Sequence, residues 1–230
     1  MKDFFLSRLP FYRWHPEVAI RYLPIVSEIL KNDYQTILEV GSGGLGITPY
    51  LGREVTGLDR HFDPPIHPLV KTKIGSALKI PFEDKSFDVV ISVDMLEHLP
   101  STQRKKAIAE ILRVTKKEII LAVPTGQESL NQDQELAAFY KKINRNNYPF
   151  LTEHKSFGLP SKEEIKSQLG DNVIMEQNEP LRLRSFLMRG WMTKNFITKL
   201  FYWKILLLAI PLFKLFDKKP YYRTIFYKAL

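Results

Sequence analysis

The 230-residue chain contains no cysteine. Disulfides, thiolate zinc sites and cysteine nucleophiles are therefore excluded, and the absence fits a reducing compartment. Residues 1–8 lack the apolar run of a signal peptide, so we expect a cytoplasmic protein. No stretch reaches the ~20 apolar residues that span a bilayer. The strongest candidate, residues 205–213, has nine.

Acidic residues are almost absent from the last 50 positions. Residues 181–230 hold eleven Lys or Arg and one acid, Asp217, whereas residues 1–180 hold 23 basic and 24 acidic residues. The net charge of +9 therefore comes from the C-terminal segment. A uniformly basic chain would favour a nucleic-acid partner. A basic segment that is also rich in Trp, Phe and Leu favours a membrane surface.

Residues 36–48, Thr-Ile-Leu-Glu-Val-Gly-Ser-Gly-Gly-Leu-Gly-Ile-Thr, are the most informative stretch. The apolar run to Val40 predicts a short buried strand, and the glycines after it predict a turn that leads into a helix. Glycines let the backbone approach a ligand closely, and a helix N-terminus presents free N–H groups. The spacing Gly41-x-Gly43-x-x-Gly46 fits a dinucleotide fingerprint, so the turn is a candidate nucleotide site.

The remaining pattern predicts a Rossmann-like, doubly wound α/β fold with a mostly parallel sheet. Strands are expected near residues 36, 54, 72, 88 and 118, with later strands at 173–177 and 221–228. Helices are expected at 15–32, where Pro24 kinks or divides the segment, and at 102–115 with a cap from Ser101 or Thr102. Ligands of such sheets bind at the carboxyl ends of the strands. Four residues fall at those ends: Gly41, Asp59, Ser76 and Asp94.

We expect a single domain over residues 1–230 with two irregular parts. Residues 125–160 interrupt the alternation and form an expected lid or acceptor-side insertion, with a helix at 128–142 and a loop at 144–154. A capping box of Ser161 and Glu164 predicts the next helix, 161–169. Residues 181–220 form a basic, aromatic-rich helical segment before the last strand.

Three motifs occur in order along the chain: residues 37–43 (Ile-Leu-Glu-Val-Gly-Ser-Gly), residues 57–59 (Gly-Leu-Asp) and residues 80–99, which include Asp94-Met-Leu-Glu-His-Leu99. Together they resemble the class I S-adenosylmethionine-dependent methyltransferases, most closely the branch acting on small molecules and lipids. The resemblance covers about residues 36–124 and recurs weakly at residues 153–160, Glu-His-Lys-Ser-Phe-Gly-Leu-Pro. It implies S-adenosyl-L-methionine as the cofactor.

Asp59, at the end of the second strand, is expected to accept hydrogen bonds from ribose hydroxyls. The resemblance implies that Glu39 and the glycine turn hold the methionyl part of the cofactor, and that Val93 forms the floor beside the sulfonium. In two places the chain departs from the family: Leu45 stands where the third glycine is usual, and Ser76 where Asp is frequent. The expected cofactor site comprises Glu39, Gly41, Ser42, Gly43, Asp59, Arg60, Ser76, Ala77, Val93 and Asp94.

The competing interpretation of the glycine turn is NAD(P) binding. Asp59 is compatible with it. Against it, no Tyr-x-x-x-Lys pair occurs in the sequence, and NAD does not explain Glu39 inside the strand. We therefore favour methyl transfer.

Methyl transfer from a sulfonium is an in-line displacement, accelerated largely by holding donor and acceptor in a near-attack geometry. A base is needed when the acceptor is a hydroxyl or another poor nucleophile. The candidate catalytic residues are His98, Asp94 and His154, with Tyr12 and Tyr140 behind them. The alternative for His98 is that it caps the following helix or hydrogen-bonds the backbone.

No metal site is predicted. The histidines at positions 15, 61, 98 and 154 do not show metal-ligand spacing with carboxylates along the chain.

Residues 186–216 are the part of the sequence that indicates the chemical class of the methyl acceptor. Aromatic residues and lysines alternate there as in an interfacial helix whose lysine stems reach the headgroups. The alternatives are a helical cap over the acceptor pocket or a dimer interface, and the oligomeric state stays open. We expect a methyltransferase at the inner face of the cell membrane that acts on a lipid-like or lipid-linked acceptor. The other hypotheses are an RNA methyltransferase that uses the basic tail, although no nucleic-acid partner is favoured, and a non-catalytic protein that binds S-adenosylmethionine.

Overall fold

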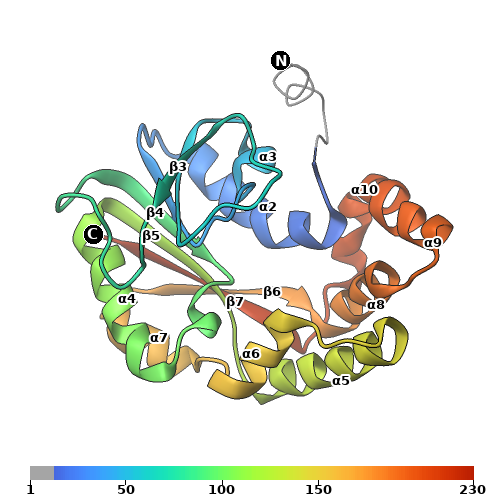
Figure 1. Ribbon diagram of the computed structural model, residues 1–230. Coiled ribbons are helices and arrows are strands. Elements are labelled where there is room, and N and C mark those ends of the chain that lie inside the picture. The colour runs from blue at the N-terminus through green and yellow to red at the C-terminus, as the bar shows by residue number, and fades with distance from the viewer. Residues whose placement is uncertain (1–12) are drawn as a thin grey trace.

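The computed structural model describes residues 13–230, in which helices pack on both faces of one seven-stranded sheet (Figure 1). The strand order is β3-β2-β1-β4-β5-β7-β6. Strands β1 to β5 are parallel, and β7 is antiparallel to both of its neighbours. The strands are β1 Ile37–Val40, β2 Val55–Asp59, β3 Val70–Ile74, β4 Phe87–Val93, β5 Thr115–Pro124, β6 Ile174–Pro180 and β7 Tyr221–Ala229. The predicted fold class is confirmed.

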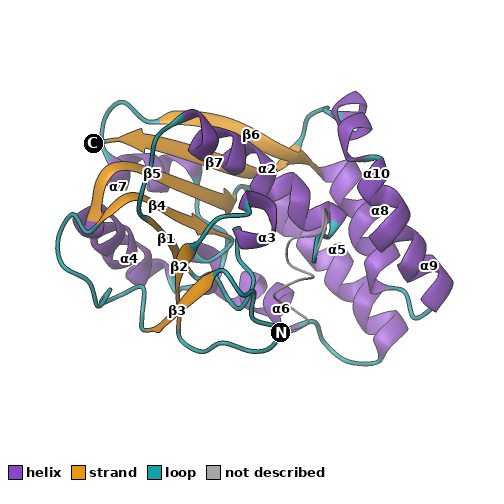
Figure 2. Cartoon of the chain, turned by 90° about the horizontal axis from the view of Figure 1, so that it is seen from above, coloured by secondary structure: helices purple, strands orange, loops and turns teal. Residues whose placement is uncertain are grey.

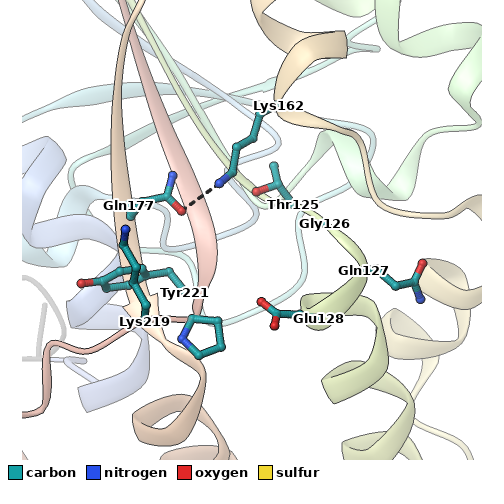
Figure 3. A pocket seen from close by; sticks show the side chains of 9 residues that line it. Thr125, Gly126, Gln127, Glu128, Lys162, Gln177, Lys219 and Tyr221 are labelled. Atoms are coloured by element: carbon teal, nitrogen blue, oxygen red, sulfur yellow. Dashed lines mark hydrogen bonds between the residues drawn. The ribbon is translucent and has the colours of Figure 1, made fainter.

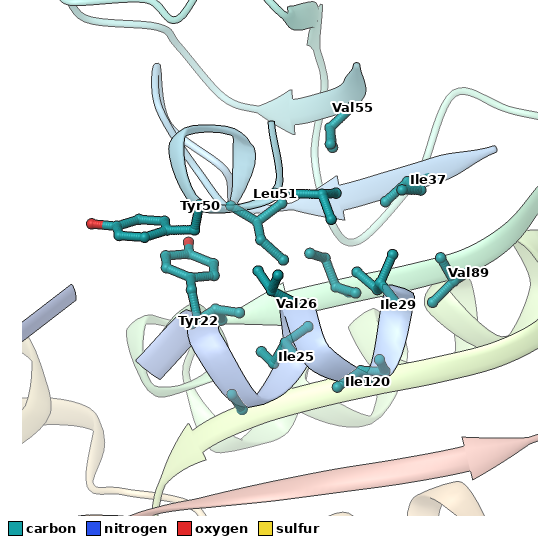
Figure 4. Packing of buried hydrophobic residues seen from close by; sticks show 14 of the residues in the cluster. Tyr22, Ile25, Val26, Ile29, Ile37, Tyr50, Leu51, Val55, Val89 and Ile120 are labelled. Carbon is teal, nitrogen blue, oxygen red and sulfur yellow. The ribbon is translucent and has the colours of Figure 1, made fainter. Parts of the chain in front are cut away.

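The central strands β1 and β4 are buried along their whole length, as expected for apolar runs covered on both faces. On one face, α2 (Pro16–Lys31) and α3 (Thr48–Leu51) pack against β1 and β4, and Figure 4 shows Ile25, Val26 and Ile29 of α2 under these strands. On the other face, α4 (Ser101–Val114) and α7 (Lys162–Leu169) form a second cluster. The sheet is thus covered by helices on both faces, and these helices support the strands whose carboxyl ends form the edge described below.

Helix α2 is a single helix although Pro24 lies inside it. Pro16 occupies its first turn, where a missing N–H costs nothing. Tyr22 of this helix stacks on Tyr50 of α3, with ring centroids 5.4 Å apart. The helix thus continues past Pro24, and its Tyr22 lies beside Glu39 at the glycine turn.

The two predicted serine caps have different outcomes. Ser161 caps α7 as expected, because its hydroxyl accepts the Glu164 N–H at 2.9 Å. The prediction for α4 is wrong: Pro100 is the N-cap, Ser101 is already helical, and no described side chain caps this end. Proline presets an extended backbone there, so the helix begins without a hydroxyl cap.

Helices α5 (Gln127–Asn144), α6 (Pro149–Phe157) and α8 (Leu181–Met192) lie beyond the carboxyl edge of the sheet (Figure 2). They share a small core of Leu136, Leu151, Met188 and Met192. The predicted loop at 144–154 is wrong from Pro149 onward, because Pro149 starts α6 instead of interrupting it. These three helices thus form one packed layer.

The basic segment continues as α9 (Phe196–Leu200), the π-helical turn η2 (Phe201–Ile205), α10 (Leu206–Leu208) and the 3₁₀ turn η3 (Ile210–Phe216). Within residues 13–230, no one helix has the length and apolarity to cross a bilayer. The stretches Phe196–Leu208 and Ile210–Phe216 satisfy that test only when taken together, and they are bent by 89°.

The Ser161 cap generates a stability prediction. Ser161→Ala should lower the free energy of unfolding by about 1 kcal/mol, because the Glu164 N–H loses its acceptor. Ser101→Ala is the matched control and should stay within about 0.5 kcal/mol of wild type, since that hydroxyl caps nothing and alanine favours helix. Urea unfolding followed by circular dichroism measures both. Equal losses in the two variants would contradict the assigned cap.

Candidate functional site

The glycine turn after β1 is tied to the end of β2. The Gly41 N–H donates to the Leu58 carbonyl at 2.8 Å, and the Gly43 N–H donates to Asp59 Oδ2 at 2.8 Å. Gly41 and Gly43 have φ angles of +80° and +54°, which favour glycine. No atom of the described residues lies within 4 Å of the position that a Gly43 Cβ would take, so this side of the turn opens on free space.

Glu39 lies behind the turn with only 1% of its surface exposed. Its carboxylate accepts hydrogen bonds from Tyr22 Oη at 2.7 Å and from the Ile47 N–H at 2.8 Å. A Cβ on Gly46 would lie 2.1 Å from Glu39 Oε2, so Gly46 is the glycine that this packing requires. Burial raises the pKa of Glu39 to about 7, although both hydrogen bonds favour the charged form.

Asp59 joins three loops at the edge. Its second carboxylate oxygen accepts the Arg60 N–H at 2.7 Å, and its carbonyl accepts the Gly75 N–H at 2.9 Å. The next residue, Ser76, turns its hydroxyl to the Leu78 N–H at 3.2 Å. Ser76 and Ala77 therefore lie beside Asp59, as the sequence predicts for residues at neighbouring strand ends.

Two segments close over the turn. The His67 N–H donates to the Gly44 carbonyl at 2.7 Å, and a Cβ on Gly44 would stand 2.4 Å from the Pro65 carbonyl oxygen. From the other side, Met95 packs on Gly41, since a Cβ there would lie 2.5 Å from Met95 Cγ. The proline-rich loop 60–69 and the end of β4 thus shape the walls of the turn.

Asp94, directly after β4, is held by two arginines. Both of its oxygens bind Arg223 at 2.6 Å, and Arg21 approaches it at 2.8 Å. Arg223 is itself buried and also binds Glu179 at 2.6 Å. Burial alone would raise the pKa of Asp94, but the guanidiniums of Arg223 and Arg21 outweigh it and hold the pKa well below its usual range. A carboxylate in this state is a poor proton acceptor.

His154 of α6 belongs to a second buried network. Its Nδ1 lies 2.7 Å from Asp133 Oδ2 of α5, and the other oxygen of Asp133 binds Arg184 at 2.7 Å. Asp133 also accepts the Tyr222 hydroxyl at 3.0 Å. His154 Nε2 is buried and has no hydrogen-bond partner within the described part of the chain.

His98 and His154 lie together, with ring centroids 4.9 Å apart. His98 Nδ1 is 2.7 Å from Glu153 Oε2, and no side chain caps α4, so the alternative of a helix cap does not apply to His98. Burial and the neighbouring His154 lower the pKa of His98. Glu97 beside it is fully buried, and neither of its oxygens has a partner among residues 13–230.

A cavity of about 690 Å³ lies farther along the same edge, between the end of β5 and strands β6 and β7 (Figure 3). Lys162 crosses its wall and donates to Gln177 at 3.1 Å. Lys219 and Glu128 also line it. No predicted site residue lines this cavity, and two strands, β4 and β5, separate it from β1 and the glycine turn.

The structure brings most of the predicted residues to one edge, in two groups. The first group surrounds the glycine turn and comprises Glu39, Gly41, Ser42, Gly43, Asp59, Arg60, Ser76 and Ala77. Val93 ends β4 between the groups and is buried in the sheet. The second contains Asp94, His98 and His154. Tyr12 and residues 1–8 lie outside the described residues.

Sequence reasoning missed the partners of the second group: Arg21, Asp133, Glu179, Arg184 and Arg223. The position of Arg223 was an indication, since a charged residue in the middle of a largely apolar strand needs a buried counter-ion. The others lie on separate helices and strand ends, with no spacing that relates them along the chain.

Comparisons with known proteins match the part of the chain that contains the glycine turn. Residues 38–123 match the model of a methyltransferase domain family. An uncharacterized protein of Haemophilus influenzae is 31% identical over 97 residues, which cover 37% of this chain and 39% of that protein. The match thus spans about two fifths of that relative's length.

Two solved structures are similar over nearly the whole chain. Magnesium protoporphyrin IX methyltransferase from Synechocystis, crystallised with bound SAH, has a TM-score of 0.53 at 12% identity, covering 99% of this chain and 85% of that one. A possible histamine N-methyltransferase from Thermotoga maritima has a TM-score of 0.55 at 15% identity, covering 99% and 97%. These similarities show the fold.

The buried Glu39 generates a pH prediction. Its pKa is about 7 in the fold against an ordinary value of 4.5, so the unfolded chain releases this proton first as the pH rises. Stability is therefore lost between about pH 4.5 and 7, by up to about 3 kcal/mol from this group. Glu39→Gln copies the protonated form, so its stability should decline less over this window. Parallel denaturation profiles of the two proteins from pH 5 to 7.5 would contradict the assignment.

Proposed function

Residues 38–123 match a methyltransferase domain family, and on this premise we propose that the protein is a class I S-adenosylmethionine-dependent methyltransferase. It binds S-adenosylmethionine at the ends of β1, β2 and β4. It transfers the methyl group to a lipid-like or lipid-linked acceptor at the inner face of the membrane. The observation that carries the proposal is the convergence of Glu39, the glycine turn and Asp59 at one edge.

The residues present fit the cofactor. Asp59 uses each carboxylate oxygen once, for the N–H groups of Gly43 and Arg60. A carboxylate has about four acceptor positions, so two stay available for ribose hydroxyls. An ammonium group beside Glu39 would favour the charged form of its carboxyl, and the open side of Gly43 admits a close ligand. When bound, S-adenosylmethionine supplies a methyl group on a positively charged sulfur.

The acceptor side is proposed to be the region between η1 (Leu96–His98) and α6. His98 and His154 are the candidates that meet an acceptor there, because Asp94 is engaged by Arg21 and Arg223. In this proposal Asp94 is a positioning residue. Its ion pairs join β4 to α2 and β7, which aligns the donor edge with the acceptor side.

The acceptor class is argued from the surface of residues 196–216. Its exposed apolar side chains include Phe196, Ile197, Leu208 and Leu215, each at least 72% exposed. Lysines 194, 199, 204 and 214 accompany them, a combination that suits an anionic lipid surface. Phe213 belongs to an apolar cluster against which Ile210 of the segment and Ile20 of α2 also pack. Arg21 and Tyr22 of that helix reach the site, so the apolar surface adjoins it.

Methyl transfer is tested with radiolabelled S-adenosylmethionine and a membrane extract, fractionated afterwards into lipid, RNA and small-molecule pools. Label should enter the lipid pool. Asp59→Asn should reduce incorporation at least about tenfold, because ribose and turn contacts are weakened together. Asp171→Asn, an exposed position at the opposite edge of the sheet, should match wild type. Label confined to RNA, or incorporation unaffected by Asp59→Asn, would contradict the proposal.

Membrane binding is tested separately by flotation with vesicles that contain anionic lipid. Wild type should float, and high salt should weaken the association because part of it is electrostatic. A Phe196→Ser/Leu215→Ser variant should stay at the bottom. The matched control, Ile74→Ser/Ile174→Ser, removes two side chains that are 71% and 70% exposed on edge strands and should still float. Equal flotation of both variants would overturn the membrane assignment and leave the methyl-transfer test intact.

A further inference from the structure

A compact group of ligand-type side chains lies between β4 and α6. Glu97 and His98 belong to η1, and His154 belongs to α6. Each offers one ligand atom, and these atoms all lie within 4.8 Å of one another. Glu97 and His154 are buried, and His98 is partly exposed, so the group is enclosed but can be reached from one side.

Both histidines have a carboxylate behind them. Asp133 Oδ2 lies 2.7 Å from Nδ1 of His154, and Glu153 Oε2 lies 2.7 Å from Nδ1 of His98. These contacts place the ring proton on Nδ1 and leave a lone pair on each Nε2. Metal-binding histidines show the same arrangement, in which the carboxylate orients the ring and raises its basicity.

Three buried polar atoms of the group lack a hydrogen-bond partner. Within residues 13–230, the two carboxylate oxygens of Glu97 have no hydrogen-bond partner, and Nε2 of His154 has none either. Leaving one such buried group unpaired costs about 1–3 kcal/mol, and more for a charged one. The nearby guanidiniums of Arg21 and Arg223 are engaged by other carboxylates. One cation would satisfy all three atoms at once.

Arg104 holds the two ligand-bearing segments at a common position. From α4, its Nε donates to the carbonyls of Leu96 and Leu99 at 3.2 Å, on either side of the ligands in η1. Its Nη2 donates to the Phe157 carbonyl at 3.1 Å, at the end of α6. The site is therefore positioned by the fold before any ion binds.

We propose that Glu97, His98 and His154 bind one divalent transition-metal ion of the zinc class. Two imidazoles and one carboxylate suit Zn²⁺ and its first-row neighbours, whereas Mg²⁺ and Ca²⁺ prefer oxygen ligands alone. Three protein ligands leave a coordination position open, as in catalytic sites. The expectation of no metal rested on spacing along the chain, and 56 positions separate the two histidines.

The role of the ion rests on the proposed function. At its open position the ion binds a hydroxyl oxygen of the acceptor and lowers the pKa of that hydroxyl, whose proton leaves to solvent. The oxygen then attacks the methyl carbon: an O–CH₃ bond forms, the S–CH₃ bond breaks, and its electron pair stays on sulfur, which becomes a neutral thioether. The two histidines thereby act as ligands instead of bases, and the acceptor class narrows to alcohols, phenols and enols.

Metal binding is tested on the full-length protein without any acceptor. After treatment with a chelator and dialysis, Zn²⁺ is titrated against a chromophoric competitor, and the visible bands of bound Co²⁺ report the ligands. Wild type should bind one ion per chain. Glu97→Gln and His98→Gln should each weaken binding by more than about 100-fold, and Asp133→Asn, which acts through His154, by about 10–100-fold. His61→Gln, a surface histidine whose side chain is 76% exposed, should match wild type.

The proposal is overturned if wild type binds no stoichiometric ion, or if Glu97→Gln and His98→Gln both bind as wild type does. Should Glu97→Gln fail to fold, His98→Gln decides alone, because His98 is partly exposed and tolerates an amide. Binding of S-adenosylhomocysteine by the metal-free protein separates the two hypotheses. Cofactor binding and methyl transfer without a metal would refute the role of the ion in the reaction and keep the proposed function. A stoichiometric metal site without methyl transfer would keep the site and refute the proposed function.

Discussion

The ion pair between Asp94 and Arg223 joins the elements on which the site depends. Asp94 ends the central strand β4, Arg223 lies in the antiparallel strand β7, and Arg21 brings α2 to the same carboxylate. Arg223 is fully buried, whereas 15% of the Asp94 side chain and 22% of the Arg21 side chain stay exposed. Taking away Asp94 would deprive a buried guanidinium of one of its two carboxylates, at a cost of up to about 3–5 kcal/mol. The pair therefore makes the geometry of the edge depend on residues 129 positions apart.

Around this ion pair the edge divides into two chemically different halves. The half at β1 and β2 is built from backbone: glycines with positive φ, N–H groups turned to Asp59, and the buried Glu39 behind them. The half at η1 and α6 is built from side chains, with two histidines, their carboxylates and Glu97. In the proposed function, the first half binds the methyl donor, which is the same molecule in every reaction of this kind. The second half, built on the more irregular helices, determines which acceptor is bound.

The predictable part of the protein was the part encoded locally. Short apolar runs, separated by glycines and helical segments, located the strands from β1 to β5. The motif of residues 36–48 identified the glycine turn. The predictions of secondary structure were wrong where one residue type occurs in two different structural positions. Pro149 suggested a loop but begins α6, and Ser101 suggested a cap but follows Pro100, which takes that position. Proline both ends and begins helices, and only the packing of the following residues selects between these uses.

The sequence by itself determined the strand–turn–helix of the glycine turn, the acid at the end of β2 and the basic, apolar character of residues 181–220, because these depend on neighbouring residues. Only the tertiary structure decided that Asp94 is held by Arg21 and Arg223, and that Glu97, His98 and His154 meet. Such contacts arise when the order of strands and the packing of α5, α6 and α8 fold distant segments onto one edge. Charge and hydrogen-bond pairing inside a protein depend on distance in space, which spacing along the chain does not encode.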